Sequence, residues 1–228
     1  MESVQPFRDR RDAGRVLARR LEAYSGSRDV VVLALPRGGV PVAYEVARVL
    51  AAPLDVFVVR KLGVPGQEEL AMGAIAAGGV GLVDRNVIEE LGITDAELEG
   101  VIRRERSELR RREQLYRAGT APLSVTDRAA ILIDDGLATG ATMNVAVRAL
   151  RERRPARIIV GVPVASATAC RELGPLADDV VCVATPEPLY SVGSWYDDFS
   201  QTTDEEVQTL LLASRRDEPP SHVPVTSS

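Results

Sequence analysis

Five short runs of Val, Ile and Leu constrain the fold of this chain more than any other feature. They lie at residues 29–35, 54–60, 129–135, 157–165 and 178–184. Because each run is almost continuously apolar rather than alternating, it is typical of a strand buried on both faces of a parallel sheet. Helical patterns at 40–51 and 141–153 lie between the runs. We therefore predict a doubly wound α/β domain whose mainly parallel five-stranded sheet is flanked by helices.

Polar segments predict two more helices and a tail. Residues 8–24 carry apolar side chains with helical spacing, and residues 94–118 begin with a capping box formed by Thr94 and Glu97. The segment 214–228 is rich in Pro and Ser, so we expect it to be disordered. The remaining residues, 1–213, are predicted to form one domain.

Composition excludes several classes of protein. The net charge is −5, which does not favour a nucleic-acid or membrane partner, and we find neither a membrane-spanning run nor a signal peptide at the start. We therefore expect a cytoplasmic protein. The only histidine, His222, lies in the polar tail, which argues against a histidine base. We expect Cys170 and Cys182 to be buried free thiols, since neither a second pair nor histidines complete a metal site.

Ligands of a doubly wound domain bind beyond the carboxyl ends of its strands, and cations and glycines follow the first two runs. Arg37, Gly38 and Gly39 follow the first, and Arg60 and Lys61 end the second. The glycines would let the backbone approach a ligand and take positive φ, and the cations would suit a polyanion. Each of these signals is weak alone, because Gly turns and surface cations are common.

Two acids and an anion-binding loop follow the third run. Asp134 and Asp135 precede residues 136–140, which are rich in Gly and Ala and lead into a helix. Free N–H groups at the start of that helix suit a phosphate. Carboxylates accept hydrogen bonds from a vicinal diol and also bind divalent cations. A ribose 5-phosphate would satisfy both halves of this segment.

The segment ILIDDGLATGATM resembles the signature of type I phosphoribosyltransferases, in which an apolar strand and two acids precede a phosphate loop. The resemblance covers roughly residues 29–200. Within it, PRGG resembles the pyrophosphate loop of the family, Arg60 and Lys61 occupy the place of its basic pair, and residues 62–83 that of its flexible loop, where we expect a lid or hairpin. The core would span about 29–184, with a small hood at 185–200 completed by N-terminal elements.

This resemblance implies transfer of the 5-phosphoribosyl group of 5-phosphoribosyl 1-diphosphate (PRPP) to a nitrogen acceptor, with release of pyrophosphate and Mg²⁺ as cofactor. Asp134 and Asp135 would hold the ribose hydroxyls and Mg²⁺. The 5-phosphate would be held by Ala138, Thr139, Gly140, Ala141 and Thr142. Pyrophosphate would be held by Arg37, Gly38, Gly39, Arg60 and Lys61.

The acceptor is less well defined. YSVGSWYDDF, residues 190–199, resembles the hood of purine phosphoribosyltransferases, with Tyr190 as the stacking aromatic and Trp195 as a second platform, although hood packing explains both equally well. Asp197 or Asp198 would be the hood acid that helps to hold metal. Ala138 stands where hypoxanthine and guanine enzymes carry an aspartate. Glu68 and Glu69 are the candidates for the catalytic general base. The resemblance thus suggests a purine-like acceptor without identifying it.

Two alternatives use the same donor site. One is a regulatory protein that senses PRPP and binds nucleic acid through the Arg-rich segment 103–112, although a solvated helix explains that segment more simply. The other is a hydrolase of a phosphorylated ribosyl compound, with water as the acceptor. If the chain self-associates, a homodimer is the assembly to expect first.

Overall fold

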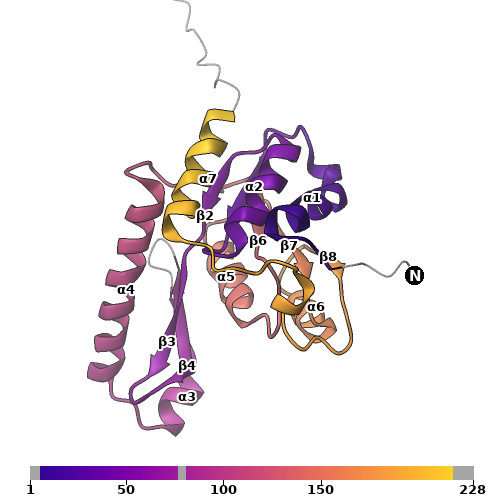
Figure 1. Ribbon diagram of the computed structural model, residues 1–228. Coiled ribbons are helices and arrows are strands. Elements are labelled where there is room, and N and C mark those ends of the chain that lie inside the picture. The colour runs from indigo at the N-terminus through magenta and orange to yellow at the C-terminus, as the bar shows by residue number, and fades with distance from the viewer. Residues whose placement is uncertain (1–5, 77–80, 218–228) are drawn as a thin grey trace, which may run out of the picture.

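Five parallel strands form the main sheet of the computed structural model, which describes residues 6–76 and 81–217 (Figure 1). Its strands are β1 (Val30–Ala34), β2 (Leu54–Val56), β6 (Ala129–Ile133), β7 (Arg157–Val164) and β8 (Asp179–Ala184). Their order is β2-β1-β6-β7-β8. The predicted fold class is confirmed. Strand order reverses between β1 and β6, which is where a doubly wound sheet binds its ligand.

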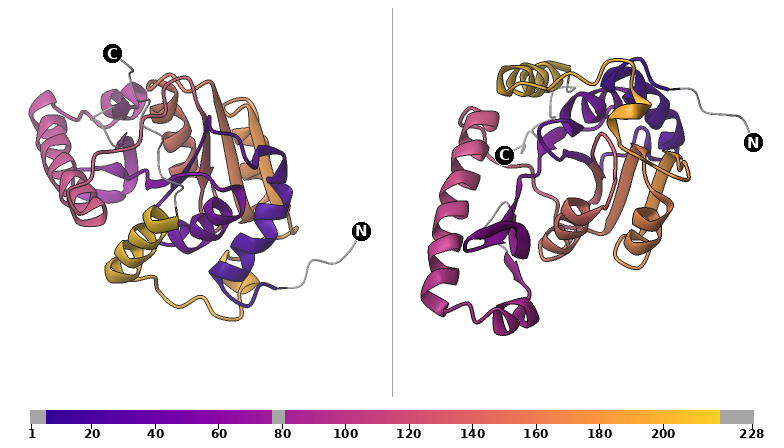
Figure 2. Two further views of the ribbon diagram at one scale, coloured as in Figure 1. Left: turned by 90° about the horizontal axis from the view of Figure 1, so that it is seen from above. Right: turned by 60° about the horizontal axis from the view of Figure 1, so that its bottom comes forward.

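Two hydrophobic cores cover the two faces of the sheet. In β1, Val30 and Val32 face one core, whereas Val31 and Leu33 face the other. The first core is completed by α1 (Arg10–Arg20), α2 (Gly39–Leu50) and α7 (Asp204–Asp217), and the second by α5 (Ala141–Arg151) and α6 (Ala167–Leu173) (Figure 2). Each buried Val or Leu contributes about 1.5–3 kcal/mol. Burial on both faces explains why the strands read as continuously apolar.

The second apolar run does not form one strand. It ends in the main sheet at Val56, and the chain then enters a three-stranded antiparallel sheet of β3 (Val59–Val64), β4 (Gln67–Ala76) and β5 (Gly81–Val83). The prediction of a single strand over 54–60 is therefore wrong. Phe57 and Val58, at the junction, are almost completely buried, so the apolar pattern gives no sign of the break. The hairpin of β3 and β4 occupies the predicted flexible segment, of which residues 77–80 lie outside the described part.

A long helix runs beside this hairpin, and together they form an arm that extends from the main sheet (Figures 1 and 2). After α3 (Arg85–Glu90), α4 (Asp95–Arg117) begins at the predicted capping box of Thr94 and Glu97, which is present. The last residue of α4, Arg117, donates from Nε to Asp55 Oδ1 at 3.1 Å and from Nη2 to the carbonyl of Val56 at 3.0 Å. This buried ion pair fixes the base of the arm to edge strand β2.

The two ends of the chain complete the fold around the sheet. A 3₁₀ turn, Glu22–Tyr24, follows α1, and a second, Gly193–Trp195, lies in the predicted hood. Phe7 forms a bridge with Tyr196, so the N-terminal segment does contribute to this region. The last helix, α7, runs four residues past 213 with Ser214 buried, so the tail was predicted to begin too early. Residues 218–228 lie outside the described part.

Candidate functional site

The acid pair lies at the carboxyl end of β6, where the order of strands reverses. Asp134 Oδ1 accepts the backbone N–H of Asp135 at 2.8 Å, and both side chains are only partly exposed. Burial raises the pKa of Asp134 well above its usual value, and the negative charge of Asp135 raises it further. The acid pair therefore favours a ligand or cation that compensates its negative charge.

Asp135 is held by Arg10, which sequence reasoning missed. Arg10 donates from Nε to Asp135 Oδ2 at 2.8 Å and from Nη1 to the carbonyl of Ser200 at 2.7 Å. Its guanidinium carbon also lies 3.9 Å from the ring centroid of Phe199. Arg10 therefore links the acid pair to the hood. It lies 125 residues before Asp135 in a polar helix, so no local pattern distinguishes it from the neighbouring arginines.

Tyr196 is a second residue that sequence reasoning missed. Its hydroxyl donates to the carbonyl of Asp135 at 2.6 Å, and its ring packs between Phe7 and Phe199. Burial, with the charge of Asp135, raises the pKa of Tyr196. The two predicted aromatics behave differently from each other: Trp195 packs against the core, whereas Tyr190 is 89% exposed. Of these two, only Tyr190 presents a ring to solvent.

The predicted phosphate loop runs from Leu137 into the start of α5. Gly140 takes positive φ, 71°, as the residue before α5, and Thr139 is exposed. The loop rests on α6, because the hydroxyl of Ser166 donates to the carbonyl of Ala138 at 2.7 Å. The first N–H groups of a helix lack partners within it. That of Ala141 donates to Oγ1 of Thr139 at a long 3.4 Å, so the start of α5 can still receive an anion.

The glycines after β1 pack closely against the acid pair. A Cβ on Gly39 would lie 2.7 Å from the carbonyl oxygen of Ile133 and 2.9 Å from Cα of Asp134. Neither Gly38, whose φ is −57°, nor Gly39 takes positive φ, so that part of the prediction is wrong. Close approach of the two loops is the reason for glycine here.

Arg37 of the same loop is joined to the last helix. Its Nη1 lies 3.9 Å from Oδ1 of Asp204, the first residue of α7. The hydroxyl of Tyr116, on α4, donates to the same oxygen at 2.7 Å, and burial together with this bond raises the pKa of Tyr116 to about 12. The predicted pyrophosphate loop therefore contacts both α7 and, through Asp204, the base of the arm.

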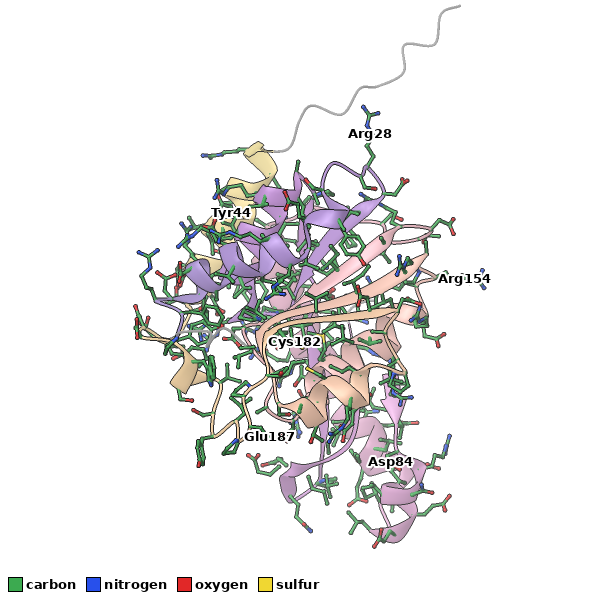
Figure 3. All side chains as sticks on the ribbon, turned by 90° about the vertical axis from the view of Figure 1, so that its right-hand side faces the viewer. Arg28, Tyr44, Asp84, Arg154, Cys182 and Glu187 are labelled. Carbon is green, nitrogen blue, oxygen red and sulfur yellow. The ribbon has the colours of Figure 1, made fainter. Side chains whose placement is uncertain are left out.

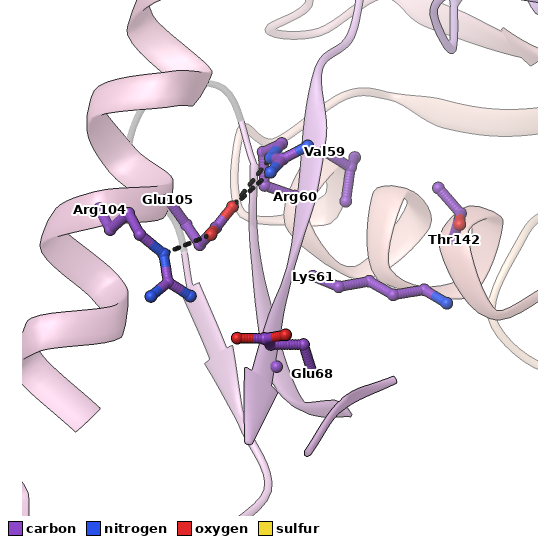
Figure 4. A pocket seen from close by; sticks show the side chains of 8 residues that line it. Val59, Arg60, Lys61, Glu68, Arg104, Glu105 and Thr142 are labelled. Atoms are coloured by element: carbon purple, nitrogen blue, oxygen red, sulfur yellow. Dashed lines mark hydrogen bonds and ion pairs between the residues drawn. The ribbon is translucent and has the colours of Figure 1, made fainter. Parts of the chain in front are cut away.

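The side chains of Arg60 and Lys61 have different neighbours. They are consecutive residues of β3, and Figure 4 shows Arg60 pointing to α4 and Lys61 pointing to Thr142. Arg60 donates from Nε and Nη2 to Glu105 Oε2 at 2.9 and 2.6 Å. Glu105 is almost buried and also accepts from Arg104 at 3.1 Å. Of the two cations, only Lys61 extends toward the predicted phosphate loop.

A hollow of about 320 Å³ separates the hairpin from α4 and α5. It is lined in part by Lys61, Glu68, Glu105 and Thr142 (Figure 4). Glu68 therefore lies beside the predicted donor site, whereas Glu69 is not among the lining residues. The hollow joins the predicted phosphate loop to the arm.

The hood acids are held by backbone contacts with the N-terminal segment. Asp197 and Asp198 donate their backbone N–H groups to the carbonyls of Phe7 and Arg8, and both side chains are exposed. Asp198 Oδ1 accepts the N–H of Ser200 at 2.9 Å, and this bond lowers the pKa of Asp198. Within residues 6–76 and 81–217, no three Asp, Glu, His or Cys side chains are placed to hold a metal ion together. The assignment of metal binding to these acids stays a prediction.

The outer face of α4 carries many arginines, but acids accompany them. Seven arginines and six acids lie in the helix, a difference of one charge. Arg103, Arg106, Arg110 and Arg111 line a hollow of about 500 Å³, and two of them are already paired, Arg103 with Glu99 and Arg111 with Glu108. This balance fits a solvated helix better than a surface for nucleic acid.

A parallel sheet of this order, with an acid pair and the predicted phosphate loop at its switch point, is the fold and site of one class of protein. The chain belongs to the phosphoribosyl transferase family, since the model of the phosphoribosyl transferase domain matches residues 9–188. The resemblance of the signature is thereby confirmed. No helix in the described ranges is long and apolar enough to cross a membrane.

Two relatives and one solved structure are similar to most of this chain. The chain is 46% identical over 211 residues to "Putative phosphoribosyl transferase Rv0571c" of Mycobacterium tuberculosis strain H37Rv, and equally to its counterpart MT0597 in strain CDC 1551. These matches cover 92% of this chain but 47% of each relative, so the chain spans about half their length. The crystal structure of TT1426 from Thermus thermophilus is 41% identical, with a TM-score of 0.80, over 92% of this chain and 99% of that one.

Proposed function

We propose that this chain transfers the 5-phosphoribosyl group of PRPP to a nitrogen acceptor and releases pyrophosphate. The observation that carries the proposal is the meeting of two loops at the switch point, where Gly39 packs against Asp134. One loop supplies acids for a diol and helix N–H groups for a phosphate, and the other supplies Arg37. Family membership supports the same donor.

In this proposal different residues bind different parts of PRPP. The amides and hydroxyls from Ala138 to Thr142 hold the 5-phosphate, and the acid pair accepts the ribose hydroxyls. Arg37 and Lys61 stabilise the charge that develops on pyrophosphate as the bond from C1 to oxygen breaks and the acceptor nitrogen bonds to C1. Arg60, which is engaged by Glu105, is assigned to holding the hairpin rather than to the leaving group.

The acid pair also fits Mg²⁺, because its carboxylates are the hard oxygen ligands that this ion prefers. Asp134 is the better placed of the two, since Asp135 is already paired with Arg10. When bound with the donor, Mg²⁺ would neutralise charge on the pyrophosphate oxygens.

The acceptor that we propose is a purine-like base. The exposed ring of Tyr190 in the hood supports it, since such a ring can stack on a planar heterocycle. Glu68, which lines the hollow beside Lys61, is the general-base candidate that we retain.

A screen of nucleobases and other nitrogen acceptors with PRPP and Mg²⁺ tests the proposal by pyrophosphate release. We expect release that depends on one class of acceptor. Release without any acceptor, with ribose 5-phosphate as the product, would instead establish the hydrolase.

Donor binding is tested separately by calorimetry with the double variant Asp134→Asn and Asp135→Asn. The change removes both carboxylate charges and should weaken PRPP binding at least tenfold, or about 1.4 kcal/mol. Affinity equal to that of the unchanged chain would refute the assignment of the acid pair. Binding of PRPP without turnover of any acceptor would favour the sensing protein.

A further inference from the structure

The two cysteines of the chain meet on the face of the sheet that carries the phosphate loop. Cys170 lies on α6, and Cys182, which is labelled in Figure 3, lies on β8. Their Sγ atoms are 2.6 Å apart. Both are free thiols, as predicted, but both residues are only partly buried. Their contact was not foreseen, because helix and strand positions twelve residues apart share no local pattern.

The two sulfurs are chemically unequal. A hydrogen bond from Cys182 lowers the pKa of Cys170, and the same bond, with burial, raises the pKa of Cys182. Since the thiolate is the reactive form of cysteine, Cys170 is the group that reacts first and Cys182 is the thiol that attacks it afterwards.

We propose that Cys170 and Cys182 are a modification site, a dithiol that peroxide oxidises to an intramolecular disulfide. The Cys170 thiolate attacks hydrogen peroxide, the O–O bond breaks, and sulfenic acid forms at Cys170. The sulfur of Cys182 then attacks that sulfur, the S–S bond forms, and the S–O bond breaks with loss of water. In total two thiols give up two electrons and two protons, and one peroxide becomes two waters.

The bond would stabilise α6 in the position on which the phosphate loop rests. Ser166, the residue before α6, donates a hydrogen bond to the carbonyl of Ala138. Ala169 of α6 lies close to Gly140, since a Cβ added to Gly140 would be 3.2 Å from the Cβ of Ala169. Because the sulfurs are already in contact, the disulfide requires little movement of α6. The oxidised chain should therefore keep the loop as it is and resist unfolding better.

The test compares the full chain before and after hydrogen peroxide. The chain has only two cysteines, so we expect loss of both thiols in the denatured protein, a mass lower by that of two hydrogens, and no disulfide-linked dimer. The melting temperature should rise by about 5 °C and return on reduction. Retention of both thiols, a linked dimer, or an unchanged melting temperature would overturn the proposal.

Variants and a ligand separate this inference from the proposed function. Cys182→Ser should leave Cys170 as a sulfenic acid that dimedone labels, whereas Cys170→Ser should remain unlabelled; equal labelling of both would contradict the assigned order. Oxidised and reduced chains should bind ribose 5-phosphate within about threefold of each other. A tenfold loss on oxidation would refute the effect on α6. If the reduced chain does not bind it, the proposed donor site fails, while thiol counts and melting still decide the disulfide.

Discussion

The replacement Glu105→Gln should separate the hairpin from α4 and weaken PRPP binding. Two charge-assisted hydrogen bonds join Glu105 to Arg60, and breaking a fully buried ion pair costs about 3–5 kcal/mol. Arg60 leaves 28% of its side chain exposed, whereas Glu105 leaves 10%, so solvent offsets part of the loss. We therefore expect the variant to be less stable by about 2 kcal/mol. If the same contact holds Lys61 toward α5, PRPP affinity should fall about tenfold, since about 1.4 kcal/mol corresponds to that factor.

Urea unfolding measures the loss of stability, and calorimetry measures the loss of PRPP affinity without knowledge of the acceptor. Glu108→Gln is the matched control, because Glu108 lies one turn along the same helix, leaves 28% of its side chain exposed and pairs with Arg111 and Arg112 rather than with the hairpin. Ion pairs of that kind contribute about 0–1 kcal/mol. The control should leave PRPP affinity unchanged.

Two results would refute the reasoning. If Glu105→Gln lowers stability as expected but leaves PRPP affinity intact, the contact is structural and does not position Lys61. If it changes neither quantity, the ion pair contributes nothing. Exchange of the two charges, Arg60→Glu with Glu105→Arg, should restore more than half of both losses, since the exchanged pair can re-form the contact.

Three further predictions concern the acid pair and its surroundings. Because burial and Asp135 raise the pKa of Asp134, its ionisation costs stability as the pH rises from about 4 through the raised pKa. Asp134→Asn should thus raise the melting temperature at pH 7.5 by about 2–4 °C per kcal/mol recovered, with the difference vanishing near pH 4; a lower melting temperature at pH 7.5 would contradict it. Gly39→Ala should lower the free energy of unfolding by about 1–3 kcal/mol, because its Cβ would meet backbone atoms. Gly100→Ala, in open space on α4, should not destabilise the chain. Equal losses of stability in urea unfolding would exclude the contact between the loops as the cause. Arg10→Ala should lower the free energy of unfolding by about 3 kcal/mol, because it leaves Asp135 unpaired and both side chains are largely buried. The control Arg11→Ala removes a side chain that is 49% exposed and should lower it by less than about 1 kcal/mol. Urea unfolding measures both losses.

The parts of the fold that sequence could predict are those with local periodicity. Continuous apolar runs indicated the parallel sheet, and the acids and predicted phosphate loop directly after the third run indicated a site beyond the carboxyl end of that strand, because chain order alone brings them together. The split after Val56 could not be predicted, since Phe57 and Val58, which lie within the break, are buried as deeply as strand residues. Burial, rather than strand pairing, is what an apolar pattern reports.

The candidate site was predicted where it follows a strand and missed where distant segments meet. Arg10 and Tyr196 reach Asp135 from opposite ends of the chain, and no spacing rule connects them. By contrast, the separation of Arg60 from Lys61 was available from the sequence. Consecutive residues of a strand point to opposite faces, so the sequence already indicated that Arg60 and Lys61 would have different neighbours, and the assignment of both to pyrophosphate stays a prediction.

The ion pair between Arg117 and Asp55 gives the arm the mechanics of a lever. With 23 residues, α4 is about 34 Å long at about 1.5 Å per residue. Its fulcrum is at Arg117, and α7 contacts the helix at this same end through Asp204 and Tyr116. A tilt of a few degrees at that end would displace the far end by several times the movement at the fulcrum. Small shifts of α7 would therefore be amplified along the hairpin that carries Lys61.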